Sequence, residues 1–175
     1  MPPCGYTVID PTMTTFKRRS VIAGIGGTVL ASLAGCLGDD DDDGNGDGNG
    51  DDSPEGRVDA FLSDNDARMY DGNVEDLTGE DTVEVVVGAG DEGLAFDPAA
   101  IRIDTGTTVV WEWTGEGGAH NVQPTGDTDF DDFGDSERVD EAGHTVESTF
   151  DEAGVGLYVC QPHAGQGMYG AVIVE

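Results

Sequence analysis

Basic residues are scarce in this chain, which has 7 lysines and arginines against 37 aspartates and glutamates and a formal net charge of −30. A nucleic-acid-binding face needs clustered lysine and arginine to neutralise phosphates, so this charge argues against nucleic acid as a partner. Histidine and cysteine are also rare, with three of each. So few donors exclude a large multinuclear metal enzyme and a dense disulfide framework. The length of 175 residues predicts one domain with appendages.

The N-terminal part lacks a hydrophobic stretch long enough to span a membrane. The uncharged stretch Val21–Gly35 holds 15 residues, whereas a helix needs roughly 20 to cross a hydrocarbon core of about 30 Å. The pair Arg18–Arg19 precedes it and small residues lead to Cys36, a pattern typical of a signal peptide. We therefore expect residues 1–35 to be a twin-arginine export signal, with Met13 an alternative translation start, and Cys36 to be lipidated. The alternative is an uncleaved anchor in which Cys36 is an ordinary apolar residue.

Lysine is absent downstream of residue 35, where four arginines face 36 carboxylates and the formal charge is −32 over 140 residues. Self-repulsion of this size opposes compaction at ordinary ionic strength, whereas at about 1 M salt the screening length falls to about 3 Å. We therefore expect a protein that works in very salty surroundings. The stretch Gly38–Ser53, with the run Asp39–Asp43, offers no apolar side chain to bury. Residues 36–56 are accordingly predicted to form a disordered acidic linker, anchored by its lipid.

The rest of the chain divides into a short preface, residues 57–81, and a β-rich domain, residues 82–175. In the preface, Val58, Phe61 and Leu62 predict one apolar side of a short helix that packs on the main domain. In the domain, short runs of β-forming residues alternate with clusters of Gly, Asp and Pro, which indicates an all-β, Greek-key antiparallel β-sandwich. The predicted strands are Thr82–Val87, Ala100–Asp104, Thr107–Trp113, His120–Pro124, Thr145–Phe150, Gly156–Cys160 and Ala171–Val174.

The β-rich domain also holds the donors of one metal site. Cys160, His163 and Met168 lie within nine residues, and His120 lies 40 residues upstream of Cys160. One thiolate, two imidazoles and a distant thioether are the donors of a trigonal copper site with a weak axial methionine. Thiolate forms a soft, covalent bond to copper, imidazole suits both oxidation states, and a weak axial ligand favours Cu(I). A zinc site would prefer a further cysteine, histidine or carboxylate to methionine.

The loop that carries three of these donors is predicted to be stiff. Pro162 fixes its own φ and favours an extended conformation at Gln161. Gly165 and Gly167 allow the tight return that brings Met168 back towards the metal.

These residues resemble the small blue copper proteins, or cupredoxins, and among them most closely the halocyanins, relatives of plastocyanin from salt-loving archaea. The resemblance covers roughly residues 81–175, including Thr105–Trp113 and Gly170–Val172. It implies one type 1 copper ion per chain. It also implies that Asn121, which follows the first ligand, ties the two ligand loops together by hydrogen bonds. The implied ligands are His120, Cys160 and His163 in equatorial positions and Met168 in the axial position.

The function expected from this reading is one-electron transfer, Cu(II)/Cu(I), between membrane-bound respiratory partners on the outer face of the cell membrane. No substrate is turned over, and a nucleophilic role for Cys160 lacks an orienting group. His163, at the loop's tip beside Ala164 and Gly165, is expected to be the electron port. His144 is expected to be a surface or strand-packing residue and not a ligand. The alternative is a copper carrier, storage or accessory protein, which would use the same donors without a redox role.

Overall fold

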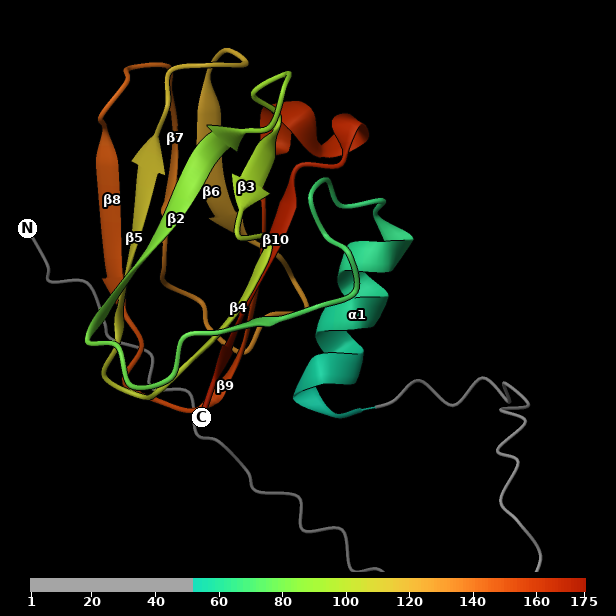
Figure 1. Ribbon diagram of the computed structural model, residues 1–175, viewed down its shortest axis with the longest axis vertical. Helices are drawn as coiled ribbons and strands as arrows, with labels where there is room; N and C mark the ends of the chain where they lie inside the picture. The colour runs from blue at the N-terminus through green and yellow to red at the C-terminus, as the bar shows by residue number, and fades with distance from the viewer. Residues whose placement is uncertain (1–51) are drawn as a thin grey trace, which may run out of the picture. The chain divides into compact units, whose positions relative to one another are not determined.

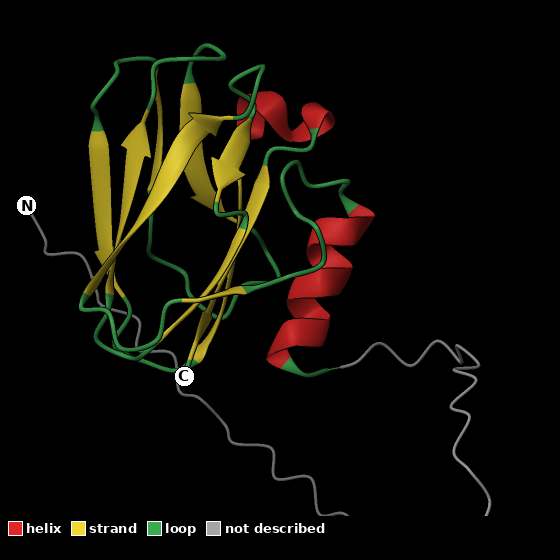
Figure 2. Ribbon diagram, in the orientation of Figure 1, coloured by secondary structure: helices red, strands yellow, loops and turns green. Residues whose placement is uncertain are grey.

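The computed structural model describes residues 52–175, so the predicted signal peptide, Cys36 and the linker up to residue 51 lie outside the described residues. Within residues 52–175 the chain is mostly β-structure, with one α-helix and one 3₁₀ helix (Figures 1 and 2). The helices are α1 (Pro54–Asp64) and η1 (Gln161–Gln166). The strands are β1 (Glu75–Asp76), β2 (Thr82–Ala89), β3 (Ala95–Asp97), β4 (Ala100–Ile103), β5 (Thr108–Trp113), β6 (His120–Pro124), β7 (Asp135–Val139), β8 (Thr145–Thr149), β9 (Gly154–Val159) and β10 (Tyr169–Val174).

The strands form two sheets that pack as a sandwich, in the orders β1-β4-β10-β9-β6-β7 and β3-β2-β5-β8. The predicted sandwich is therefore confirmed, and every strand predicted from the sequence is present, β6 with its predicted ends and the others with shifted ends. Three short or charged strands, β1, β3 and β7, were not predicted. The sheets are mixed and not purely antiparallel, because β1 and β10 both pair with β4 in parallel and β2 pairs with β5 in parallel.

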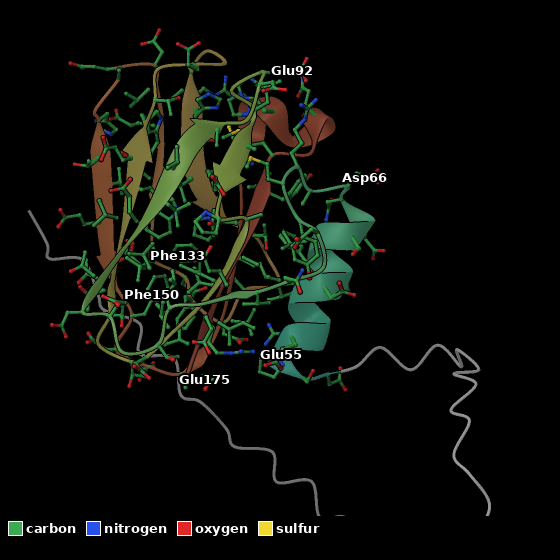
Figure 3. All side chains as sticks on the ribbon, in the orientation of Figure 1. Glu55, Asp66, Glu92, Phe133, Phe150 and Glu175 are labelled. Carbon is green, nitrogen blue, oxygen red and sulfur yellow. The ribbon has the colours of Figure 1, made fainter. Side chains whose placement is uncertain are left out.

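The interior between the sheets is built by alternation along the strands. In β5, Val109, Trp111 and Trp113 are buried, whereas the residues between them are partly exposed. Successive side chains of a strand point to opposite faces, so this pattern turns one face of β5 inwards. Phe133 and Phe150, labelled in Figure 3, join the same interior, with their ring centroids 5.5 Å apart.

Strands β9 and β10 are buried on both faces because α1 covers the outer one (Figure 1). Val58 and Leu62 of α1 are fully buried and pack in a second apolar cluster with residues of the two strands, among them Leu157 and Ile173. Phe61, also expected on this side, is partly buried against the same cluster. The predicted helix thus buries its apolar side chains against the sandwich. This burial supplies most of the stability of so short a helix.

Capping fixes the start of α1. The Ser53 hydroxyl accepts a hydrogen bond from the Gly56 amide at 3.0 Å, and Pro54 occupies the first turn, where no amide donor is needed. The helix therefore begins inside the stretch 36–56 that was expected to be linker. Neither helix within residues 52–175 is long and apolar enough to cross a membrane.

Candidate metal centre

The four predicted donors gather at one end of the sandwich. His120 is the first residue of β6, Cys160 directly follows β9, and Met168 directly precedes β10. Because β6 and β9 are antiparallel, with Gln123 opposite Val159, the start of one lies beside the end of the other. His163 lies on η1, the short helix at this end of the sheets in Figure 2.

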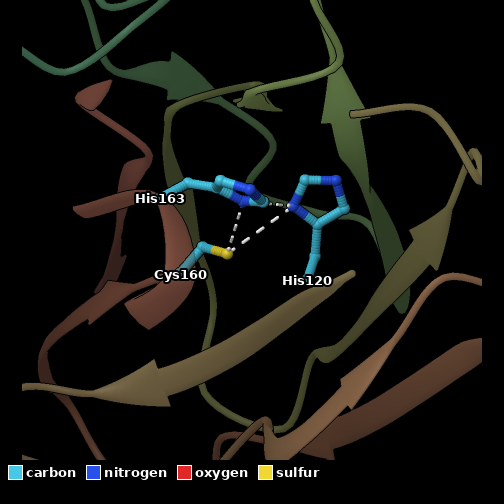
Figure 4. A group of neighbouring side chains, drawn as sticks. All are labelled: His120, Cys160 and His163. Carbon is cyan, nitrogen blue, oxygen red and sulfur yellow. Dashed lines mark hydrogen bonds between the residues drawn. The ribbon is translucent and has the colours of Figure 1, made fainter. Parts of the chain in front are cut away.

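Three of the donor atoms form a small triangle (Figure 4). The Cys160 Sγ lies 3.6 Å from His120 Nδ1 and 3.4 Å from His163 Nδ1. The two Nδ1 atoms are 3.1 Å apart. The structure thus brings together two imidazole nitrogens and one sulfur, and within residues 52–175 this cluster includes no carboxylate.

The orientation of the His120 ring is set by a backbone carbonyl. His120 Nε2 donates to the Glu116 carbonyl oxygen at 2.7 Å, so the proton resides on Nε2 and the lone pair of Nδ1 faces Cys160 and His163. Metal-binding histidines commonly donate their second ring N–H in this way, which fixes tautomer and orientation. Two nitrogens 3.1 Å apart beside a sulfur could bind one cation together. This donor set suits copper.

Burial favours the neutral forms of the Cys160 thiol and of the His163 imidazole. His120 and Cys160 are fully buried, and burial raises the pKa of the Cys160 thiol. Burial, followed by the neighbouring His120, lowers the pKa of His163. The Cys160 thiol therefore tends to keep its proton, and the His163 imidazole tends to stay neutral. A thiophilic metal that binds here must displace the thiol proton, which couples metal uptake to proton release.

Met168 is held next to this triangle by the backbone of the loop. Its side chain is fully buried. Its carbonyl accepts a hydrogen bond from the Cys160 amide at 3.0 Å, and its amide donates to the His163 carbonyl at 3.3 Å. The turn that makes this possible is at Gly167, whose φ of +80° is in the left-handed region that favours glycine.

Asn121 and Pro162 shape the start of the same loop. Asn121 is 2% exposed, and its Oδ1 accepts a hydrogen bond from the Gln161 amide at 2.9 Å. This bond joins the strand of His120 to the residue after Cys160. Pro162 occupies the first turn of η1, where its missing amide leaves no hydrogen bond unmade. His144 is outside the cluster and packs edge-on against Trp113, with ring centroids 4.9 Å apart.

A further brace around His120 was not predicted from the sequence. A bulge in β2 places Gly88 at φ +85°. The Thr114 hydroxyl donates to the Gly88 carbonyl at 2.9 Å and accepts from the Glu116 amide at 3.1 Å. Glu116 in turn supplies the carbonyl that orients His120. The signal that could have revealed this brace is Gly88 itself, directly after the predicted strand Thr82–Val87, because a glycine at a strand often marks a bulge or a close backbone approach.

Comparisons with known proteins identify the wider group. The family of copper-binding proteins that includes plastocyanin and azurin matches residues 83–175, a segment that contains all four donors. Halocyanin of Natronomonas pharaonis is 62% identical over 165 residues, which cover 93% of this chain and 100% of that protein. Chloroplastic plastocyanin of Pisum sativum is 34% identical over 100 residues, 53% of this chain and 59% of that protein. The solved structure of a purple cupredoxin from Nitrosopumilus maritimus aligns with 26% identity and a TM-score of 0.43 over 53% of this chain and 99% of that one.

Proposed function

This chain belongs to the plastocyanin/azurin family of copper-binding proteins, and from that premise we propose that it carries single electrons on one copper ion. The ligands we propose are His120, Cys160, His163 and Met168. The observation that carries the proposal is the triangle of two Nδ1 atoms and one Sγ within 3.1–3.6 Å of one another. When bound there, copper supplies a Cu(II)/Cu(I) couple that takes up and releases one electron.

The residues of the chain hold the donors in one arrangement. The Glu116 carbonyl fixes the His120 ring, and Asn121 fixes the start of the loop that carries the other donors. The closed core beneath, with Trp113 1% exposed, excludes water from the buried side of the site. Donors that stay in place between two oxidation states make electron transfer fast, because little rearrangement accompanies the change of charge.

The exposed side of the site supports His163 as the electron port. His163 is partly exposed, whereas His120 and Cys160 are fully buried. Its neighbours Ala164 and Gly165 carry no charge and are small. Small, uncharged residues beside His163 suit transient docking of a redox partner, which uses small interfaces and fast release.

We further propose that the protein works on the outer face of the cell membrane, between respiratory partners held in that membrane. The proposal rests on two features of the sequence. The pair Arg18–Arg19 would direct export of the chain, and the small residues before Cys36 would mark the site of cleavage and of Cys36 lipidation. The acidic linker that precedes α1 would then tether the β domain to the membrane. Mass spectrometry of the N-terminal peptide from membranes of the native host tests this part, because an unmodified Cys36 or an intact residue 1–35 segment would contradict it.

The electron-carrier proposal is tested on purified, copper-loaded protein. We expect an intense visible band from thiolate-to-copper charge transfer, together with a reversible one-electron wave in voltammetry. Weakly held copper without a reversible wave would instead favour copper carriage. Cys160→Ser should abolish the band and leave the fold of the apo protein intact, because the sandwich core does not depend on the metal. His144→Gln is the matched control, since His144 lies outside the donor cluster, and it should keep the band.

A further inference from the structure

The segment that follows α1 lies against the outside of the loop that carries His163 and Met168. Arg68 makes three contacts there. Its amide donates to the Gly167 carbonyl at 2.8 Å, and its Nε donates to the Gln166 carbonyl at 2.7 Å. Its Nη1 pairs with Glu92 at 2.5 Å, in the loop between β2 and β3. Two of these contacts are therefore with consecutive residues of the stretch that joins His163 to Met168.

The approach of this segment to the loop is close enough to require a glycine. A Cβ placed on Gly167 would lie 2.4 Å from the Asp66 carbonyl oxygen and 3.6 Å from the Arg68 Cγ. Figure 3 shows Asp66 just beyond α1 and Glu92 in a loop at the end of the sandwich that carries η1. Gly167 therefore serves two purposes, because it turns the chain towards Met168 and makes room for the segment that presses on the loop.

The backbone of this segment is itself held in an uncommon conformation. Asp66 and Met69 have φ values of +49° and +62°, and they are the non-glycine residues with positive φ within residues 52–175. Such a conformation persists where the surroundings fix the chain on both sides. Here the Ala67 amide donates to the Leu62 carbonyl at 2.8 Å and the Arg68 amide donates to Gly167, so α1 and the ligand loop are the two fixed sides.

From these contacts we propose that Arg68 is a positioning residue for the copper ligands, and that residues 66–68 clamp the ligand loop from outside. The inference rests on the proposed function, because it concerns the same site. Asn121 holds the loop from the inner side through the Gln161 amide, at the loop's beginning. Arg68 holds the far end, next to Met168. The ion pair with Glu92 is exposed and contributes little by itself; its role is to aim the guanidinium at the Gln166 carbonyl.

The test compares copper retention in variants of full-length protein that has been loaded with copper. Arg68→Gln removes the guanidinium contacts with Gln166 and Glu92 but keeps the backbone bond to Gly167. We expect a copper affinity about tenfold weaker, the loss typical of groups that orient ligands. We also expect a shift of the visible charge-transfer band, which a role in stability alone would not move. The affinity is measured by competition with a chelator at about 1 M salt, where the screening length of about 3 Å suppresses the effect of the lost charge.

Two further variants separate the clamp from charge and from general anchoring. Arg68→Lys keeps the charge but lacks the fork that reaches Gln166 and Glu92 together, so it should behave like Arg68→Gln. Arg57→Gln is the matched control, because Arg57 also pins the N-terminal segment to the sandwich but does so at Asp129, away from the loop. It should leave both the band and the affinity unchanged.

The outcomes decide the proposal. Wild-type retention and spectrum in Arg68→Gln, or full rescue by Arg68→Lys, would overturn it. If Arg68→Gln does not fold, Glu92→Gln takes its place; faster copper release supports the clamp and unchanged release overturns it. Failure of the unaltered protein to give the charge-transfer band would count against the proposed function instead, so the two proposals fail separately.

Discussion

Gly88 offers a direct test of how β2 supports the His120 side of the site. Its φ is +85°, and a Cβ there would lie 2.6 Å from Thr114 Oγ1, 2.8 Å from the Glu116 carbonyl oxygen and 3.3 Å from His120 Nε2. Gly88→Ala would therefore push on the carbonyl that orients His120. The left-handed conformation costs about 1–2 kcal/mol for a residue with a Cβ, and overpacking adds about 1–3 kcal/mol. Together they predict a loss of about 2–5 kcal/mol in the free energy of unfolding.

Gly106→Ala is the matched control for this substitution. Gly106 has a φ of +89°, but nothing lies within 4 Å of the position of its Cβ. It lies before β5, whereas the site lies beyond the other end of that strand. The control should cost only the conformational part, about 1–2 kcal/mol, and leave copper affinity unchanged.

Denaturant unfolding of the apo protein and chelator competition of the loaded protein measure the two effects. Gly88→Ala should lower copper affinity about tenfold, as expected for loss of a group that orients a ligand. Equal losses of stability in the two variants, with copper affinity unchanged in both, would refute the idea that the bulge supports His120.

Two further predictions concern charge. With 37 carboxylates against 7 basic residues, the apo protein should unfold at a higher temperature as salt rises from about 0.1 M to about 1 M, because the screening length falls from about 10 Å to about 3 Å; a melting temperature independent of salt would contradict this. The bond from Arg57 to Asp129, 2.6 Å long, lowers the pKa of Asp129. Because this pKa is lower in the folded protein, the ionised carboxylate stabilises the fold at pH values above the unfolded pKa of about 3.9. This stabilisation is lost as the pH falls through the folded pKa. Arg57→Gln should therefore cost less than about 1 kcal/mol at pH 7, since the two side chains are 32% and 43% exposed and solvent screens the pair. The difference from the unaltered protein, followed by unfolding at each pH, should shrink below about pH 4; a constant difference down to pH 2 would show that Asp129 titration plays no part.

The sequence predicted strands best where apolar side chains alternate or run together. In β5 the alternation of Val109, Trp111 and Trp113 is enough to define a strand with one buried face. The strand β7 was missed because its residues, Asp135–Val139, are mostly polar and charged. It lies at the edge of its sheet, where charged residues discourage pairing with other chains. The parallel pairing of β2 with β5 was also missed, because partners so far apart leave no local signal.

The candidate site shows the same limit at the level of single atoms. His120, Cys160, His163 and Met168 were recognisable because only a few side-chain types bind copper well. The Glu116 carbonyl was not, because it acts through a backbone oxygen that any residue in that place would supply. Arg68 was missed for a different reason, since 98 residues separate it from Gln166 and only the fold brings them together.

The placement of arginine in so acidic a chain indicates which parts need to be held together. Residues 52–175 contain four arginines, and three of them join the segment before β2 to the rest of the domain. Arg57 binds Asp129, Arg68 binds Glu92, and Arg102 of β4 pairs with Glu55 of α1. Each exposed pair contributes little alone, but together they place cations along the seam between α1 with its following segment and the sandwich. Arg68 contacts the loop that carries His163 and Met168. Partial opening of this seam should therefore alter the copper site before the core of the sandwich unfolds. Heating the copper-loaded protein should therefore change the visible band before the β-structure melts; coincident transitions would show that the seam and the sandwich open as one unit.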